Sequence, residues 1–208
     1  MRGGTGAPGL SRCPKIGNVP KVSQEYMQNR RSEIVEVARS LFARSGYQQA
    51  SMSEIIAATG LSAGAIYNHF SSKTELMSAA ARVNLDRFTA SSDELPWDFV
   101  ERCLRELQTD HQLTRFFAIT WGEAATVPEI AAVVDEQLGQ LRDRVIAVYR
   151  RWAEAELDLT GSELETWLDM LAAAVLSVFT GFVMQSTALA NFDAERYFEF
   201  SRTILRQG

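Results

Sequence analysis

Residues 50–76 read ASMSEIIAATGLSAGAIYNHFSSKTEL, and the fold of the chain follows from this stretch. The Ser-x-x-Glu pair at Ser51 and Glu54 is typical of a helix start, because the hydroxyl and the carboxylate satisfy free amides of the first turn. A second short helix begins at Ser62, after a turn at Gly60. Two short helices joined by a glycine turn have the outline of a helix-turn-helix.

The apolar positions of this stretch are spaced to bury a small three-helix core. The predicted core residues are Ile55, Ile56, Leu61, Ile66, Phe70 and Leu76. The second short helix begins with small residues, which let a helix approach a DNA groove closely, and its free amides suit a phosphate. Tyr67, His69 and Lys73 suit phosphate contacts, and Asn68 suits a base edge.

Helical periodicity extends over almost the whole chain, and no run alternates as a paired strand would. Upstream, a helix from Glu25 to Ser45 carries one apolar stripe and ends at Gly46. A further helix follows Ser72 and runs to about Thr89. More helices are predicted at 96–109, 112–125, 128–157, 162–189 and 193–206, with Ser72–Glu75 and Ser162–Glu165 as two more Ser-x-x-Glu starts. The predicted fold class is therefore all-α.

Charge divides the chain at Thr89 into two unequal parts. Residues 1–89 carry 11 Lys and Arg against 6 Asp and Glu, whereas residues 90–208 carry 10 against 20. The two formal charges are +5 and −10, within a total of −5. The basic part suits phosphate, and the acidic part limits non-specific contact with DNA. We predict a helix-turn-helix domain at 23–89 and a second domain at 90–208.

Residues 1–22 are rich in Gly and Pro, and we predict a disordered basic arm there. The sequence leaves open whether this arm contacts DNA and whether Met27 is the true start. Only Cys13 and Cys103 occur, outside any disulfide, redox or metal spacing, which favours a reducing, cytoplasmic location. Hydroxyl and amide residues interrupt the uncharged run at 170–192, so we predict a helix buried on most faces and no membrane span.

A dense motif links this chain to a known family. The pattern G-x-S-x-G-x-I-Y-x-H-F-x-x-K-x-x-L is met in register, after an AxxLFxxxGY-like turn in the upstream helix. The matching residues are Ala38, Leu41, Phe42, Gly46, Tyr47, Gly60, Ser62, Gly64, Ile66, Tyr67, His69, Phe70, Lys73 and Leu76. Over about residues 29–77 the chain closely resembles the DNA-binding domain of the TetR family of repressors.

This resemblance implies an N-terminal three-helix DNA-binding domain whose second short helix enters the major groove. The implied DNA-binding residues are Ala63, Gly64, Ala65, Tyr67, Asn68 and His69 at the groove, Ser51, Ser53 and Lys73 toward the backbone, and Ser62 as the helix cap. One departure is Ala63, which stands where relatives often carry a larger polar or basic side chain. Direct base readout would then be sparse, leaving Asn68, methyl contacts and DNA shape to supply specificity.

The second half of the chain resembles the family in architecture only. Similar proteins dimerise through their last two long helices, here 162–189 and 193–206, and bind a ligand between the preceding helices. Surplus apolar residues on the last two helices support a homodimer, namely Trp167, Leu168, Leu171, Val175, Phe179, Phe182, Tyr197, Phe200, Ile204 and Leu205.

Aromatic residues gather where the ligand pocket is expected, although aromatic residues at helical spacing also suit an ordinary core. We predict ligand binding by Phe116, Phe117, Thr120, Trp121, Tyr149 and Trp152, with Glu123 and His111 as further polar groups. The effector of this bundle domain would be a small apolar or aromatic molecule.

The sequence thus predicts a ligand-responsive regulator, most simply a repressor, that binds a palindrome in double-stranded DNA as a homodimer and is not an enzyme. It has no recognisable metal-ligand spacing, phosphate loop or nucleophile–base pair, so no cofactor or metal is expected. Two other classes stay open: a helical enzyme or carrier, motivated by the aromatic residues, and a protein-interaction module with a structural helix-turn-helix. Effector, operator, regulated genes and sign of regulation are not given by the sequence.

Overall fold

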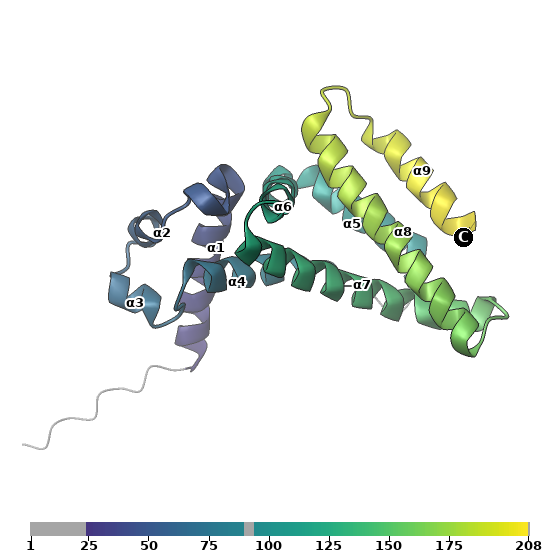
Figure 1. The fold of residues 1–208 in the computed structure, drawn as a ribbon, viewed down its shortest axis with the longest axis horizontal. Helices are drawn as coiled ribbons and strands as arrows, with labels where there is room; N and C mark the ends of the chain where they lie inside the picture. Colours follow the sequence, from purple (N-terminus) through teal and green to yellow (C-terminus); the bar gives the residue numbers. More distant parts are fainter. Residues whose placement is uncertain (1–23, 90–93, 208) are drawn as a thin grey trace, which may run out of the picture.

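The computed structural model describes residues 24–89 and 94–207, and every regular element in these ranges is an α-helix (Figure 1). The helices are α1 (Gln24–Gln49), α2 (Met52–Thr59), α3 (Ala63–Tyr67), α4 (Lys73–Asp86), α5 (Pro96–Thr109), α6 (His111–Ala124), α7 (Pro128–Glu156), α8 (Gly161–Ala188) and α9 (Ala194–Gln207). The all-α prediction is confirmed. The predicted arm at 1–22 lies outside the described residues, as does the start of the second domain at residue 90.

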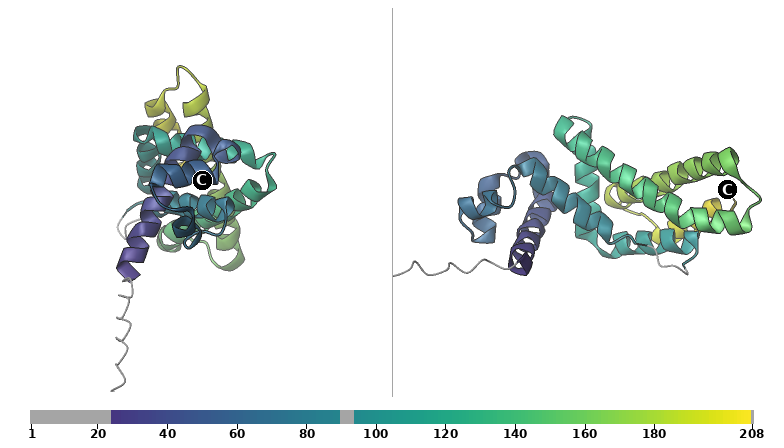
Figure 2. Two further views of the ribbon diagram at one scale, coloured as in Figure 1. Left: turned by 90° about the vertical axis from the view of Figure 1, so that its left-hand side faces the viewer. Right: turned by 90° about the horizontal axis from the view of Figure 1, so that it is seen from below.

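Helices α1 to α4 form one end of the molecule, with α2 and α3 farthest from α8 and α9 (Figures 1 and 2). Their core is the predicted one: Ile55, Ile66, Phe70 and Leu76 are fully buried, and Ile56 and Leu61 are partly buried against them. Helix α1 adds Ile34, Ala38 and Phe42 to this core. Burial of these side chains fixes the short helices α2 and α3, which are too short to be stable alone.

The polar helix starts were predicted with mixed success. Ser51 and Glu54 form the complete capping box, and Ser62 accepts a hydrogen bond from the Ala65 N–H. Ser72 caps α4 by accepting from the Glu75 N–H, but the Glu75 carboxylate accepts from Ser71 instead of Ser72. For Ser162 and Glu165 the predicted helix start is confirmed to within one residue, but the predicted capping box is wrong. Helix α8 already begins at Gly161 without a side-chain cap, and Glu165 instead pairs with Arg150 at 2.6 Å.

Helix α8 carries Glu163, Glu165 and Asp169 in its first part, is mostly apolar from Met170 to Met184, and has a broad buried face. It is the one described helix long and apolar enough to cross a membrane, and 44% of its apolar window is buried in the protomer. That face packs against α5, α6, α7 and α9, which makes α8 a core helix of the second domain. The prediction of burial on most faces is confirmed for residues 170–184, where a single stripe that includes Met170 (70%) and Met184 (48%) is exposed and the remaining positions are buried or partly buried.

Candidate DNA-binding surface and effector pocket

Helix α3 presents a small-residue surface to solvent. Ser62 caps it, and Ala63, Gly64, Tyr67 and Asn68 are all exposed, Tyr67 by 51%. Ala65 and His69 are half-buried, so their side chains are less available to a partner. The predicted groove-facing residues therefore share one surface, with two of them at its inner margin.

The serines at the start of α2 differ in how far they are free to bind a phosphate. The Ser51 hydroxyl accepts from the Glu54 N–H and lies 2.9 Å from the carboxylate of Glu54. The Ser51 backbone N–H and hydroxyl both donate to the Glu54 carboxylate, and these two bonds hold the pKa of that carboxyl below its ordinary value of 4.5. Ser53 is exposed, and its hydroxyl lies 2.9 Å from that of Ser51. Ser53 is thus the more accessible of the two hydroxyls.

Lys73 directs its ammonium group toward the protein. Its Nζ donates to the carbonyl oxygens of Tyr47 at 2.7 Å and Ala50 at 3.0 Å. The same nitrogen lies 4.2 Å from the centroid of the Tyr47 ring, within cation–π distance. Lys73 therefore joins the start of α4 to the segment between α1 and α2, a structural role that the sequence motif did not predict.

Arg31 of α1 supports the end of α3 and was missed by the sequence analysis. Its guanidinium donates to the carbonyl of His69, lies over the Phe70 ring with 4.0 Å to the centroid, and is 3.7 Å from the carboxylate of Glu75. The only hint in the sequence was a basic residue in the helix before the motif. Three contacts from one side chain hold the segment that connects α3 to α4.

Glu123 of α6 binds the backbone where α1 bends. Gly46 has φ +79° and ψ 172°, a conformation that interrupts the helix and that other residues rarely adopt. Beyond it, the N–H groups of Tyr47 and Gln48 donate to the Glu123 carboxylate at 2.7 and 3.1 Å. We expected Glu123 beside a ligand, but it instead links the second domain to the helix-turn-helix.

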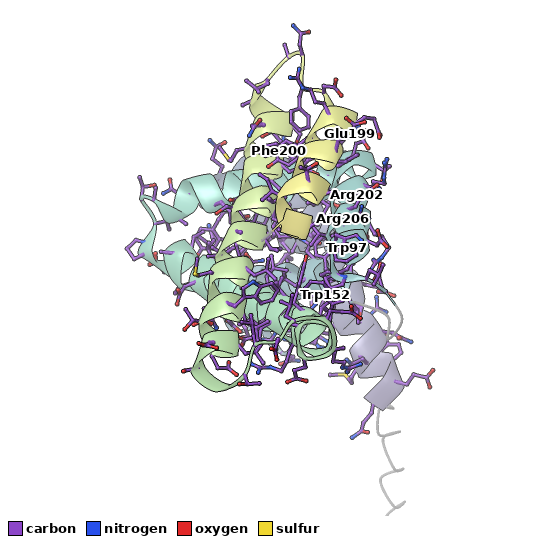
Figure 3. The ribbon with its side chains drawn as sticks, turned by 90° about the vertical axis from the view of Figure 1, so that its right-hand side faces the viewer. Trp97, Trp152, Glu199, Phe200, Arg202 and Arg206 are labelled. Atoms are coloured by element: carbon purple, nitrogen blue, oxygen red, sulfur yellow. The ribbon has the colours of Figure 1, made fainter. Side chains whose placement is uncertain are left out.

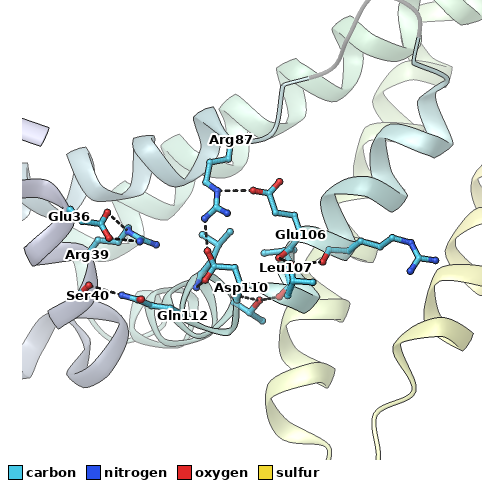
Figure 4. Close-up of polar contacts among 12 residues, drawn as sticks. Glu36, Arg39, Ser40, Arg87, Glu106, Leu107, Asp110 and Gln112 are labelled. Atoms are coloured by element: carbon cyan, nitrogen blue, oxygen red, sulfur yellow. Dashed lines mark hydrogen bonds and ion pairs between the residues drawn. The ribbon is translucent and has the colours of Figure 1, made fainter. Parts of the chain in front are cut away.

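Further polar contacts surround this junction of α1, α4, α5 and α6 (Figure 4). Gln112 of α6 donates to the Ser40 hydroxyl of α1 at 2.7 Å. Arg87, just after α4, binds Glu106 of α5 at 2.7 Å and Asp110, between α5 and α6, at 2.6 Å. The end of α4 is therefore attached to the α5–α6 turn, so a displacement of α6 would act on α4 as well as on α1.

A small cavity of about 10 Å³ lies where the end of the helix-turn-helix domain meets the second domain, among α4, α5, α6, α7 and α8. Its lining residues are Leu85, Phe88, Leu107, Phe117, Trp121, Gln137, Leu138, Leu141 and Phe179. Phe117 and Trp121 stack with their ring centroids 5.2 Å apart. Of the six residues predicted to bind a ligand, these two line the cavity.

The other four predicted ligand-binding residues do not line this cavity. Phe116 and Thr120 are buried on α6 beside it, and Tyr149 is buried on α7. The Trp152 ring lies 5.5 Å from that of Trp97, between centroids (Figure 3). It also lies 6.1 Å from the ring of Trp167, again between centroids. His111 borders a separate open groove of about 610 Å³ among α5, α6 and the end of α8. The aromatic residues thus divide between at least two places.

The fold and the exposed helix α3 define a helix-turn-helix protein with a second, all-helical domain. Residues 34–80 match the model of the family described as bacterial regulatory proteins, tetR family. The helix-turn-helix of this chain is therefore that of the TetR family of transcriptional regulators.

Two relatives and two solved structures give the extent of the likeness. The chain is 29% identical to the HTH-type transcriptional repressor Rv1474c of Mycobacterium tuberculosis, over 81% of this chain and all of that protein. It is 42% identical to the HTH-type transcriptional repressor AcnR of Corynebacterium diphtheriae, over 33% of this chain and 36% of that one.

Among solved structures, Salmonella enterica GusR superposes with a TM-score of 0.70 at 22% identity, covering 90% of this chain and 97% of GusR. SmeT in complex with triclosan has a TM-score of 0.68 at 22% identity, covering 86% and 91% of the two chains. At these identities the structural matches establish the fold.

Proposed function

We propose that this protein is a repressor that binds a palindromic operator as a homodimer and is released by a small apolar or aromatic effector. It acts on DNA in the cytoplasm without catalysing a reaction. The observation that carries the proposal is the exposed surface of α3. No packing contact within the protomer requires a glycine at Gly64 on that surface. A Cβ atom built at Gly64 meets nothing within 4 Å.

Glycine inside a helix costs about 1 kcal/mol relative to alanine, and the protomer itself gives no packing reason for it at Gly64. A close-fitting partner supplies the reason, because a missing side chain lets the helix backbone approach a groove. Tyr67 and Asn68 flank the same surface with polar groups. We assign Ser53 and Tyr67 to phosphates and Asn68 to a base edge.

The homodimer is proposed from apolar surface that α8 and α9 leave uncovered. The exposed residues are Met170 (70%), Met184 (48%) and Leu189 (55%) of α8 and its end, with Phe200 (56%) and Ile204 (41%) of α9. Most residues on which the sequence analysis based the dimer, such as Leu168 and Phe182, are buried within the protomer. A two-fold interface would cover the exposed set and space two α3 helices about 34 Å apart, one turn of DNA.

Effector release is proposed from the position of α6. Trp121 borders the cavity and Glu123, two residues later, binds the backbone at the bend of α1. A ligand that enters the cavity and displaces α6 therefore also disturbs the bond between Glu123 and the bend of α1. The structurally similar protein SmeT was solved in complex with triclosan, a small molecule. Such a displacement would favour a dimer with the wrong spacing of its α3 helices.

The test begins with selection of bound sequences from random DNA duplexes. We expect a palindrome whose affinity falls steeply with salt, because phosphate contacts release counterions. Phe200→Asp should yield monomers and weaken palindrome binding, whereas Val83→Asp, at an exposed apolar residue of α4, should leave the dimer intact. Absence of any salt-sensitive duplex affinity in the native protein would refute the repressor proposal.

A further inference from the structure

The buried amide of Gln137 has no hydrogen-bond partner among the described residues. Gln137 lies on α7, is 4% exposed, and neither its Nε2 nor its Oε1 is bonded. It borders the cavity described above and also a smaller cleft between α4 and α7. An amide side chain can make four hydrogen bonds, so this one is left without any.

The other residues around the cavity are apolar or aromatic, and none of those lining it is charged. Trp121 supplies a second unused donor, because its buried indole N–H is also without a partner. Aromatic rings enclose the space: Phe88 lies 6.4 Å from Phe117 and 6.1 Å from Phe179, between ring centroids. The cavity therefore combines a flat aromatic wall with two uncharged polar groups.

A leucine or methionine would fill the position of Gln137 and avoid the desolvation of an unbonded amide. Buried polar side chains are almost always bonded in native proteins, and the exceptions concentrate where a ligand or a chemical function uses them. Gln137 was not singled out by its sequence context. Its amide is buried only because α4, α6 and α8 pack around it in the folded chain.

We propose that this cavity is the centre of the effector site and that Gln137 selects an effector that is uncharged, flat and largely apolar, with one group that both donates and accepts hydrogen bonds, as a carboxamide does. This inference rests on the effector-released repressor proposed above. The exclusion of ions follows from the lining, because a carboxylate or ammonium group would be desolvated there without a counter-charge.

The cavity must expand when it is filled. Its volume of about 10 Å³ suffices for one water molecule, so an organic ligand has to separate the surrounding helices. Leu85 and Phe88 at the end of α4 belong to the wall, and Arg144 of α7 donates to the carbonyl of Leu85. Expansion therefore acts on α4, which leads into the helix-turn-helix, as well as on α6.

The experiment uses three probes of similar shape: benzamide, benzoate and ethylbenzene. Binding is measured as the rise in Tm of the full chain, which is about 4 °C for a ligand at ten times its Kd. We expect benzamide and ethylbenzene to raise Tm and benzoate to leave it unchanged. In Gln137→Leu the benzamide shift should be lost while the ethylbenzene shift remains.

Without ligand, Gln137→Leu should raise Tm by a few degrees, because an unbonded amide is removed. Gln137→Met, of similar length, is the second variant if leucine packs poorly. The matched control is Gln140→Leu, on the same helix. The native Gln140 amide is bonded to Glu136, so the Tm shift of this variant with benzamide should equal that of the native chain.

Three results would overturn the inference. The first is an equal Tm shift with benzamide and benzoate, and the second is no shift with either neutral probe. The third is a lower Tm in both Gln137 variants with unchanged benzamide binding, which would mean that the folded protein satisfies the amide by itself. Operator binding is measured separately. Absence of duplex affinity would refute the repressor proposal, whether or not the selectivity for benzamide is found.

Discussion

The carboxylate of Glu123, near the end of α6, accepts a 2.7 Å hydrogen bond from the backbone N–H of Tyr47, just beyond the bend in α1. Tyr47 is bound from α4 as well, since its carbonyl accepts from Lys73 and its hydroxyl lies 2.8 Å from that of Thr74. One residue thus connects α1, α4 and α6. Tyr47 is one of the points at which the second domain holds the helix-turn-helix, beside the Gln112–Ser40 and Arg87 contacts.

Glu123→Gln should weaken this connection. The amide keeps one acceptor oxygen but turns an NH₂ group toward the second backbone N–H, so two charge-assisted bonds become one ordinary bond. We expect the free energy of unfolding to fall by about 1–2 kcal/mol and operator affinity to fall about tenfold. Titration of labelled operator measures the affinity. Glu156→Gln, at an exposed residue, is the control. If the two variants bound the operator equally well, α6 would not hold the helix-turn-helix in its DNA-binding position through Glu123.

Gly46→Ala should destabilise the protein by about 2 kcal/mol or more. The backbone at Gly46 has φ +79°, and an added Cβ would lie 2.8 Å from the Glu123 Oε1. Gly139→Ala is the matched control, because Gly139 is within α7 and its Cβ would meet nothing within 4 Å. Chemical denaturation of both variants checks the contrast. A Gly46 variant as stable as the native chain would show that the bend is not required.

Gly64→Ala should separate stability from DNA binding. The added methyl group has free space in the protomer and improves helix propensity, so we expect stability to be unchanged or to rise by up to about 1 kcal/mol. Operator affinity should nevertheless fall at least tenfold, because under the proposed function the methyl group would lie between α3 and the operator. Thermal unfolding and operator titration are measured on the same sample. Native affinity in this variant would remove the argument for close approach at Gly64.

Asn68→Ala and Lys73→Ala should have different effects. Asn68 is exposed at the end of α3, so its loss should alter the preferred DNA sequence and leave stability unchanged. Lys73→Ala removes two bonds to the carbonyls of Tyr47 and Ala50, and should lower stability by about 1–3 kcal/mol while weakening all duplexes alike. Selection from random duplexes and thermal unfolding distinguish the two. If Lys73→Ala changed the preferred DNA sequence, this would contradict its structural role and indicate that Lys73 contacts a base directly.

Glu75 should contribute stability that depends on pH. Bonds from the Ser71 N–H and hydroxyl hold the pKa of the Glu75 carboxyl below 4.5. A group whose pKa is lower in the folded state stabilises the fold above the unfolded pKa, and this stability is lost as pH falls through the folded pKa. The side chain is 43% exposed, so solvent keeps the contribution below about 1 kcal/mol. The Tm difference between native and Glu75→Gln protein should be fully present at pH 7, begin to fall near pH 4.5, and be lost as pH drops through the lowered pKa of the folded state.

Local sequence was sufficient to predict where the helices lie and that α3 is exposed. Ser51 with Glu54, Ser62 and the glycine turn at Gly60 define α2 and α3 through bonds that span three residues or fewer. The predicted groove residues consequently share one surface. The failure at Ser162 has a physical reason too: a Ser-x-x-Glu pattern competes with tertiary partners, and Arg150 bound the Glu165 carboxylate.

By itself, then, the sequence determined the all-helical class, the helix-turn-helix and its family, because periodicity and capping depend on near neighbours in the chain. Only the tertiary structure decided that Lys73 faces the protein, that Glu123 holds Tyr47, and that Gln137 is left unbonded beside a cavity. Glu123 and Tyr47 lie 76 positions apart in sequence. Contacts over such separations form only when several helices pack together, and no local pattern encodes which polar group will then find a partner.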